Sequence, residues 1–404
     1  MATEGRSVDS TSAPLSSDLE SAGFVHIVAR ADGDALAASG LLARALAERD
    51  TPFQVSTGRT VASRTARVRE RSSDSDDVTV GIGAIDAGVT RLETTDRPAT
   101  LAALECVRDL GTTPDPVLAL AGLVAAEIEP GAGESEWVLE TAKDRDLVAR
   151  RPGVAAPTAD PVDGIAHSTR LLGPWSGDVD AAREALVGLG VALDSPETLA
   201  DDDHRAIGSA VALDVVGADE ATATAADAIQ RALRPYATPD HVFETVGGFA
   251  DVLEATARVE PGTGVALAMG HDVHEPALAA WREYGRRAHE ALEGASTSRY
   301  NGLFVVRIDG GPVTAVGRLV AAFRSLEPVV LAISGGSADD GIGEAALVTR
   351  DDDVLGATVE GIARALGDTG DASAEYDIGH RRGYLRYNSI EDDATIIETV
   401  RELL

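Results

Sequence analysis

The stretch Val25–Gly40, with the sequence VHIVARADGDALAASG, decides the fold of this chain. An apolar run typical of a buried strand ends in an Asp32-Gly33 turn, and a small-residue segment typical of a helix follows at once. A strand, a tight loop and a helix N-terminus in this order form the place where α/β proteins keep metal and phosphate chemistry. We therefore expect an α/β fold with its chemistry at this turn.

On either side of this stretch, strand-like and helix-like patterns alternate along the chain. Strand-like runs lie at residues 24–29, 53–56 and 78–85, with helical patterns at 35–49 and 98–110. Such alternation is typical of a parallel sheet covered by helices. Mostly helical patterns follow, and from residue 301 onward strands and helices alternate again.

The chain is too long for one ordinary core, so we expect two domains. Residues 1–20 are rich in Ser, Thr, Asp and Glu and are predicted to form a disordered tail. A first α/β domain is expected over 21–238 and a helical connector over 239–300. A second, smaller α/β domain is expected over 301–404.

The composition is strongly acidic. The 404 residues include 67 Asp and Glu against 35 Lys and Arg, which gives a formal net charge of −32, and Lys143 is the sole lysine. This pattern is typical of proteins from a salt-saturated cytoplasm, and the alternative is an acidic protein of ordinary salinity that avoids nucleic acid. At molar salt the Debye length is only about 3 Å, so the net charge does not exclude nucleic-acid binding by local arginines.

The cysteine content and hydropathy indicate whether the chain forms disulfides or crosses a membrane. Cys106 has no second cysteine to pair with, so an intramolecular disulfide is excluded. No apolar run approaches the length needed to cross a bilayer, and the N-terminus has no basic region followed by an apolar one. A cytoplasmic protein without membrane association is therefore expected.

Several further segments have sequences similar to those of one known family, in the same order along the chain. They are Arg151–Val154 running on to His167-Ser168, Leu253–Arg258, Arg318–Phe323 followed by Glu327–Leu331, Ala345–Arg350, and Gly379-His380. With the opening turn, they resemble the archaeal RecJ-like and GINS-associated nucleases of the DHH phosphoesterase superfamily over residues 22–404. The resemblance implies a parallel-sheet DHH-like domain followed by a smaller α/β DHH-associated domain.

The resemblance also implies a reaction, namely phosphodiester hydrolysis with two Mn²⁺ or Mg²⁺ ions held by Asp and His side chains. The family's first motif is a strand running into His-x-Asp-x-Asp-Gly. Here Val28 and Arg30 stand at the first two positions, and Asp32 matches the third. Arg30 would bring a cation to the place where a metal ion should lie.

The other metal motifs are also incomplete. Asp86 follows the third strand-like run, and Thr95–Pro98, with Asp96, is the best counterpart of the Asp-His-His signature. The final motif, Gly-x-x-x-Asp at a helix end, has Ala126 in place of Asp, unless Glu127 or Glu129 substitutes.

The residual catalytic candidates are therefore Asp32, Asp86 and Asp96, and the metal candidates are Asp32 and Asp86. Three Asp without a His make a poor two-metal site, so we expect no cofactor or one residual Mn²⁺ or Mg²⁺ ion. The plain alternative for Asp32 is a loop residue that caps the following helix. If the chain is an enzyme at all, it is a metal-dependent phosphodiesterase or exonuclease.

The run Gly379–Tyr387 is the best nucleic-acid-binding candidate, because three arginines and two tyrosines interleave in it without an acidic residue. Arginine suits phosphates, and tyrosine faces suit unstacked bases. The alternative is a strand with arginines outward and tyrosines inward. With the arginine of the family's Ser-x-Arg motif included, the predicted contacts are Arg350, Gly379, His380, Arg381, Arg382 and Arg386.

By the same resemblance, the function expected first is that of a DNA replication or repair factor with its nuclease activity lost. Its expected partners are single-stranded DNA or RNA, and GINS or a RecJ-like paralogue. Two alternatives remain open: an active Mn²⁺-dependent single-strand exonuclease, and a phosphoesterase acting on small nucleotides. Fold analogy is by itself a weak argument for function.

Overall fold

The computed structural model describes residues 15–71, 76–92, 97–335, 341–350, 355–368, 374–388 and 393–404. Residues 1–14 of the expected tail lie outside this set. The rest of that tail differs from the expectation, because Leu15–Ser21 forms helix α1 and its Leu19 side chain is only 1% exposed. The apolar positions of this short segment pack onto the first domain.

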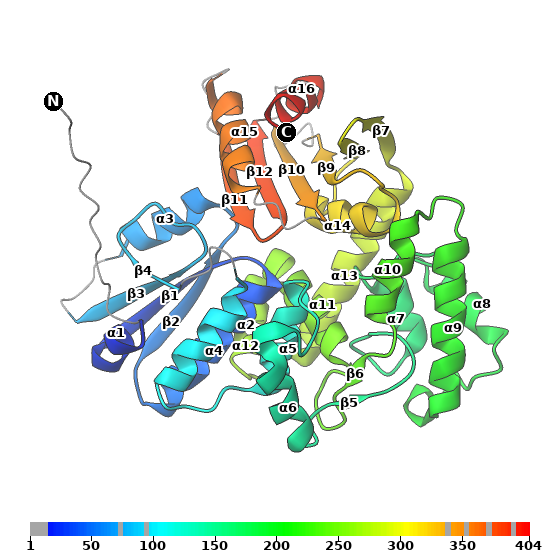
Figure 1. Cartoon of the computed structure of the whole chain (residues 1–404), viewed down its shortest axis with the longest axis horizontal. Coiled ribbons are helices and arrows are strands. Elements are labelled where there is room, and N and C mark those ends of the chain that lie inside the picture. The colour runs from blue at the N-terminus through cyan, green and yellow to red at the C-terminus, as the bar shows by residue number, and fades with distance from the viewer. Residues whose placement is uncertain are drawn as a thin grey trace.

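The first domain contains a four-stranded parallel sheet in the order β2-β1-β3-β4 (Figure 1). Strand β1 (Phe24–Arg30) pairs with β2 (Phe53–Gly58) on one side and with β3 (Asp77–Ile82) on the other. The short β4 (Thr90–Arg91) lies at the edge beyond β3. The parallel sheet expected from the alternating pattern is confirmed, and β1 is its fully enclosed central strand.

Helix α2 (Gly33–Glu48) begins directly after β1 and is buried along almost its whole length. It packs against four other helices: α4 (Ala99–Asp109), α5 (Pro116–Ala125), α11 (Val246–Val259) and α12 (Pro261–Ala268). Its Ala and Gly residues let these helices approach closely. A Cβ atom on Gly40 would lie 2.4 Å from the carbonyl oxygen of Ala268. The small-residue composition is thus explained by crowding on every side.

Helices α11 and α13 lie in the middle of the molecule, and α7 to α10 lie to one side of them (Figure 1). Helix α11 and the long α13 pack against each other. Strands β5 and β6 form a two-stranded antiparallel ribbon that brings together the segment before α7 and the segment after α10. The remaining elements before the second sheet are α3 (Val61–Arg69), which packs beside the first sheet, and α6 (Glu136–Asp144), β5 (Ala149–Arg150), α7 (Pro161–His167), α8 (Val179–Val187), α9 (Asp201–Gly217), α10 (Ala223–Ala232), β6 (Tyr236–Ala237) and α13 (His274–Glu293).

The second domain is a six-stranded mixed sheet in the order β11-β12-β10-β9-β8-β7. Only the β8–β9 pair is parallel. Helix α14 packs on one face of the sheet, and α15 and α16 pack together on the opposite face. The elements are β7 (Ser296–Tyr300), β8 (Leu303–Ile308), α14 (Val313–Phe323), β9 (Val329–Ser334), β10 (Ile342–Thr349), α15 (Gly356–Asp368), β11 (Glu375–Gly379), β12 (Arg382–Asn388) and α16 (Asp393–Leu403).

The two-domain α/β architecture expected from the sequence is confirmed, but its internal boundaries differ. Strand β7 belongs to the second sheet, so this sheet begins at Ser296, within the segment expected to be a connector. Helix α11, from the same segment, is part of the first domain's core. Within the described residues, every helix is too short or too polar to span a bilayer.

Helix α13 crosses α7 at Gly285, and this close contact can be tested by substitution. A Cβ atom on Gly285 would lie 1.8 Å from the carbonyl oxygen of His167, whereas one on Gly262 would meet nothing within 4 Å. We expect Gly285→Ala to lower the free energy of unfolding by about 2 kcal/mol or more through overpacking. The control Gly262→Ala should leave it unchanged or raise it by up to about 1 kcal/mol. Denaturant unfolding of both variants checks this, and equal stabilities would contradict the packing.

Candidate functional site

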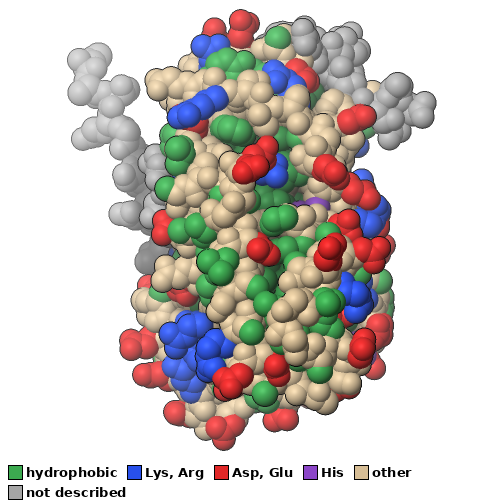
Figure 2. Space-filling model, turned by 90° about the vertical axis from the view of Figure 1, so that its right-hand side faces the viewer, with side chains coloured by type: hydrophobic (Ala, Val, Ile, Leu, Met, Phe, Trp, Pro, Cys, Tyr) green, Lys and Arg blue, Asp and Glu red, His purple; other side chains and the backbone are tan. Residues whose placement is uncertain are grey.

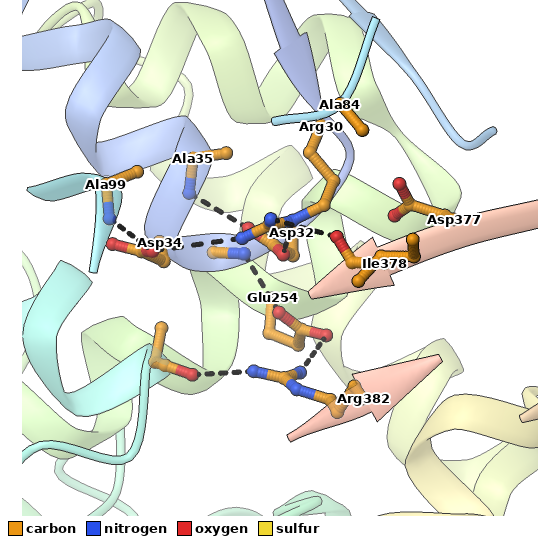
Figure 3. Close-up of polar contacts among 12 residues, drawn as sticks. Arg30, Asp32, Asp34, Ala35, Ala84, Ala99, Glu254, Asp377, Ile378 and Arg382 are labelled. Carbon is orange, nitrogen blue, oxygen red and sulfur yellow. Dashed lines mark hydrogen bonds and ion pairs between the residues drawn. The ribbon is translucent and has the colours of Figure 1, made fainter. Parts of the chain in front are cut away.

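The candidate site lies at the carboxyl end of β1, where the chain turns into α2 (Figure 3). The Asp32 Oδ1 atom accepts a hydrogen bond from the Ala35 backbone N–H at 2.9 Å, so Asp32 is the N-cap of α2. Its other oxygen, Oδ2, accepts a short hydrogen bond from the Arg30 guanidinium Nε. Both oxygens of the one carboxylate that matches the metal motif are therefore engaged within the protein.

Arg30 reaches from β1 across the turn toward the second domain. Its guanidinium donates to the Ile378 carbonyl oxygen at 3.3 Å and lies 3.9 Å from Asp34 Oδ2. Gly379 borders the same guanidinium, since a Cβ atom at that position would lie 3.7 Å from the Arg30 Cζ. The arginine thus fills the space between the turn and the β11–β12 hairpin.

The Asp34 carboxylate stabilises the start of a different helix, α4. Its carboxylate accepts hydrogen bonds from the Ala99 and Thr100 backbone N–H groups, at 2.8 and 2.9 Å, and from the Thr100 hydroxyl at 2.7 Å. These groups lie at the start of α4, so Asp34 stabilises the N-terminus of that helix. A second acidic side chain of the turn is therefore also fully used in hydrogen bonds.

Glu254 of α11 joins the turn to the second domain. Its Oε2 accepts from the Gly33 backbone N–H at 2.8 Å, and its Oε1 lies 3.2 Å from Arg258 and 3.1 Å from Arg382. Arg382, on β12, also donates to the Ala125 carbonyl oxygen at 2.9 Å. Glu254 is 1% exposed, so these contacts are made away from water.

One further ion pair and one hydrogen bond extend this network along the boundary of the two domains. Arg64 of α3, which is fully buried, contacts Asp377 of β11 at 2.5 Å. The Thr60 hydroxyl donates to the Glu375 carboxylate at 2.8 Å. Buried pairs of this kind hold two parts in one orientation, because separating them would leave charges without partners.

The charges of the network act on one another. Burial opposes ionisation of Asp32, but Arg30, Arg382 and Arg258 outweigh it and hold the pKa of Asp32 well below its usual value. Burial likewise opposes ionisation of Glu254, yet the surrounding arginines lower its pKa to about 2. Asp34 shows the opposite shift, since burial and the neighbouring Asp32 raise its pKa.

These residues do not fit a two-metal centre. No three His, Cys, Asp or Glu side chains come together in a metal-binding group anywhere in the described part of the chain. Asp86 lies past the end of β3 on the exposed surface, where its backbone groups bond to Thr65 and Arg69. Asp96 lies outside the described residues, and Glu127 lies 3.8 Å from the Arg318 guanidinium.

The predicted nucleic-acid contacts are divided between interior and surface. Arg350 donates to the carbonyl oxygens of residues 325, 326 and 327, and Arg382 is bound to Glu254. Arg386 is exposed on β12, and His380 and Arg381 form the tip of the β11–β12 hairpin.

Tyr384 and Tyr387 are both buried, which matches the alternative of inward-facing tyrosines and not the expectation of base-stacking ones. The Tyr384 hydroxyl donates to Glu344 at 2.6 Å.

Several residues of the site were not candidates from the sequence, although Glu254 lies in the family-like segment Leu253–Arg258. Arg30 was recognisable as a cation at a metal position, but nothing indicated that Glu254, Arg64 or Asp377 would contact the same region. They come from α11, α3 and β11, far apart along the chain. On the surface, acidic side chains are scattered over the face shown in Figure 2, and basic ones are fewer, with one group at its lower left.

Comparison with known proteins finds one relative by sequence and, separately, solved structures with a similar fold. The chain is 44% identical over 385 residues to "Uncharacterized protein rrnAC1427" of Haloarcula marismortui, covering 94% of this chain and 96% of that one. The family described as the C-terminal domain of rrnAC1427 matches residues 295–402.

Among solved structures, Cdc45 from Entamoeba histolytica matches with a TM-score of 0.59 and 9% identity, covering 96% of this chain and 97% of that one. A RecJ exonuclease bound to manganese matches with a TM-score of 0.45 and 13% identity, over 97% and 93% of the two chains.

The pKa of Glu254 predicts how acid acts on the fold. A carboxyl group with a lowered pKa in the folded state stabilises the protein above its ordinary value of 4.5, and this contribution is lost as the pH falls toward about 2. We expect Glu254→Gln to remove this part of the pH dependence. At neutral pH it should lower the free energy of unfolding by about 3–5 kcal/mol, because buried arginines lose their partner. Denaturant unfolding across a pH series checks this; parallel curves for the two proteins would contradict it.

Proposed function

Since this chain belongs to the rrnAC1427 family and shares the fold of Cdc45, we propose that it is a RecJ-like DNA replication or repair factor without nuclease activity. In this role it binds a single strand or a replisome partner such as GINS or a RecJ-like paralogue. The proposal rests on the site more than on the fold, because the fold alone is compatible with several functions.

The observation that carries the proposal is the Arg30–Asp32 ion pair (Figure 3). Two-metal hydrolysis needs carboxylate and imidazole ligands that are free to bind ions, which activate a water and stabilise the charge of the transition state. Here a guanidinium group occupies the turn, and the oxygens of Asp32 and Asp34 accept hydrogen bonds from the protein. A divalent ion at this position would meet the Arg30 guanidinium and two carboxylates that are already hydrogen-bonded.

The same contacts suit a protein that works by presenting surfaces. Arg30, Arg64 and Arg382 each connect the first domain or α11 with the β11–β12 hairpin. Next to the turn, buried ion pairs tie the two domains together and leave the β11–β12 hairpin fixed against the first domain. A constant relative orientation of the two domains favours a scaffold over a processive enzyme.

For strand binding, the better candidates in the arginine-rich run are the residue at the hairpin tip and the exposed residue on β12. Arg386 points to solvent, and Arg381 lies at the hairpin tip, while Arg382 is committed to the interior. Arginine contacts to phosphates give affinity without sequence preference. We therefore assign strand binding to Arg381 and Arg386 and a structural role to Arg382.

The first prediction is that the protein is catalytically silent. Purified protein with Mn²⁺ in multimolar KCl should leave labelled single-stranded DNA and RNA intact, because water activation and charge stabilisation both need metal ligands. A gel assay over long incubation measures this. Hydrolysis that disappears in Asp32→Asn, which retains a helix-capping side chain, would refute the proposal and favour an active exonuclease. Hydrolysis of nucleotides alone would favour a small-molecule phosphoesterase.

The second prediction concerns the arginine-rich run. The Arg381→Ala, Arg386→Ala double variant should weaken single-strand binding and reduce the salt dependence of the binding constant by about one unit of slope for each phosphate interaction removed. The control is Arg299→Ala, an exposed arginine of β7 that pairs with Glu327. Fluorescence anisotropy over a KCl series measures both. Equal weakening in the two proteins, or none in either, would exclude this run as the binding surface.

A further inference from the structure

Strand β7 forms the outer edge of the second sheet and has one open side. It is the last strand in the order of that sheet, next to β8 (Figure 1). Its other side forms no backbone hydrogen bond with any described residue. At the opposite end of the sheet, β11 is covered by the first domain, where its Asp377 contacts Arg64 of α3. Strand β7 therefore offers unpaired backbone groups to a further strand.

The sequence of β7 lacks the features that usually prevent such pairing. Its five residues, Ser296–Tyr300, include no proline, no lysine and no acidic residue, and their pairing with β8 runs without a bulge. Proteins commonly protect a sheet edge with one of these features. Arg299 is the one charged residue of the strand, and its side chain is 64% exposed. The strand is thus suited to being covered by another strand.

A cavity of about 690 Å³ lies beside β7. It is bordered by Thr297 of β7, by Phe304 of β8 and by the ends of α9, α13 and α14. Leu292 and Val320 contribute to its apolar wall. Because side chains alternate along a strand, Arg299 points to the same face of the sheet as Thr297. A strand added to β7 would therefore place every second side chain at this cavity.

The charged residues of the cavity are mostly acidic. Asp219, Glu220 and Glu293 line it, and Arg324 is the basic residue among the described lining. Arg324 pairs with Glu220 at 2.9 Å. The described lining therefore carries an excess of about two negative charges, which favours a basic side chain from the strand that covers β7.

Helix α9 adds exposed apolar surface near the cavity. It borders the cavity through Val215, and its Leu213 and Val216, about one turn apart, are 75% and 53% exposed. A specific interface buries at least about 1,000 Å² in total, which is more than a five-residue strand pair supplies. Apolar side chains beside the strand can provide the remaining area.

The sequence of β7 suits pairing with a second copy of itself. In an antiparallel pair, directly opposite residues point to the same face, so a two-fold axis between identical strands passes through one residue. With the axis at Ser298, all five residues pair, and Arg299 of each copy lies opposite Thr297 of the other. With the axis at Arg299, two like charges would lie opposite each other, which is unfavourable. The register at Ser298 brings a basic residue to the acidic cavity.

We propose that this face is an interface between two copies of the chain, in which the β7 strands pair antiparallel around Ser298. Arg299 of each copy then reaches the acidic cavity of the other. Within one copy Arg299 pairs with Glu327 at the surface, and an exposed pair of this kind contributes little, so it can be exchanged. The net charge of −32 does not oppose the contact at molar salt, because the Debye length there is only about 3 Å.

This interface goes beyond the proposed function and is independent of it. It uses none of the residues of the Arg30–Asp32 turn and none of the arginine-rich run Gly379–Tyr387. The first measurement is sedimentation velocity of the full-length protein in multimolar KCl over a series of protein concentrations. We expect a particle with twice the mass of one chain.

A cysteine variant tests the register. Directly opposite residues of an antiparallel pair have Cα atoms about 5 Å apart, which is within the range of a disulfide. Ser298→Cys should therefore form a covalent dimer under oxidising conditions. The control Ser296→Cys should not, because the two copies of that residue would lie roughly 14 Å apart. The native Cys106 is buried and does not compete.

Charge reversal tests the contact with the cavity. Arg299→Glu should weaken the dimer at least about tenfold, because it brings a carboxylate to an acidic lining. Adding Asp219→Arg to Arg299→Glu should restore the dimer, since Asp219 is exposed at the cavity. The matched control is Arg205→Glu, at the far end of α9, where the arginine pairs with Asp202. It should leave the dimer unchanged.

Four results would overturn the proposal: a monomer at every concentration, a dimer that Arg299→Glu does not weaken, no restoration by Asp219→Arg, or no covalent dimer of Ser298→Cys. Thermal unfolding of each variant checks that it is folded. A monomer that still binds a single strand through Arg381 and Arg386 would remove this interface and leave the proposed function standing.

Discussion

The structure depends on charge compensation at the end of β1. Arg30 and Asp32 are both largely buried, and each would be costly to bury alone. Their pairing lets the chain leave the sheet, start α2 and contact the second domain within a few residues. Because Asp32 also caps α2, the ion pair and the helix start are fixed by one carboxylate. Every other interaction of the site is arranged around this pair.

From this pair, a chain of buried contacts runs into the second domain. Glu254 receives the Gly33 N–H on one oxygen and two arginines on the other, and Arg382 carries the connection onward to β12. Breaking a buried ion pair lowers the free energy of unfolding by more than a surface ion pair raises it. The reason is that the remaining buried charge has no water to solvate it. The two domains are therefore held in one orientation, which suits a protein that presents surfaces to partners.

The use of arginine explains how so acidic a chain maintains this interior. Arg30, Arg64 and Arg318 are all buried, and lysine occurs once in the chain. A guanidinium group has five donors in a rigid plane and can satisfy a carboxylate and a carbonyl oxygen together, as Arg382 does with Glu254 and Ala125. A few arginines thus serve inside, while others, such as Arg205 and Arg386, remain with the acidic residues on the surface.

The sequence by itself determined the local elements: β1, the Asp32 turn, α2, the parallel pairing and the two-domain α/β architecture. Apolar periodicity and turn chemistry act over a few residues, so they can be read along the chain. It also identified Arg30 as a cation at a metal position. The edge strands β7 and β11 could not be predicted because they are short and polar. Only the tertiary structure decided that Glu254, Arg64 and Asp377 share the boundary of the domains, that Tyr384 is buried, and that Thr297 borders one cavity with Asp219 and Glu293. Some of those contacts join residues more than 300 positions apart. Their partners are selected by packing and charge compensation across the fold, which a local sequence pattern does not show.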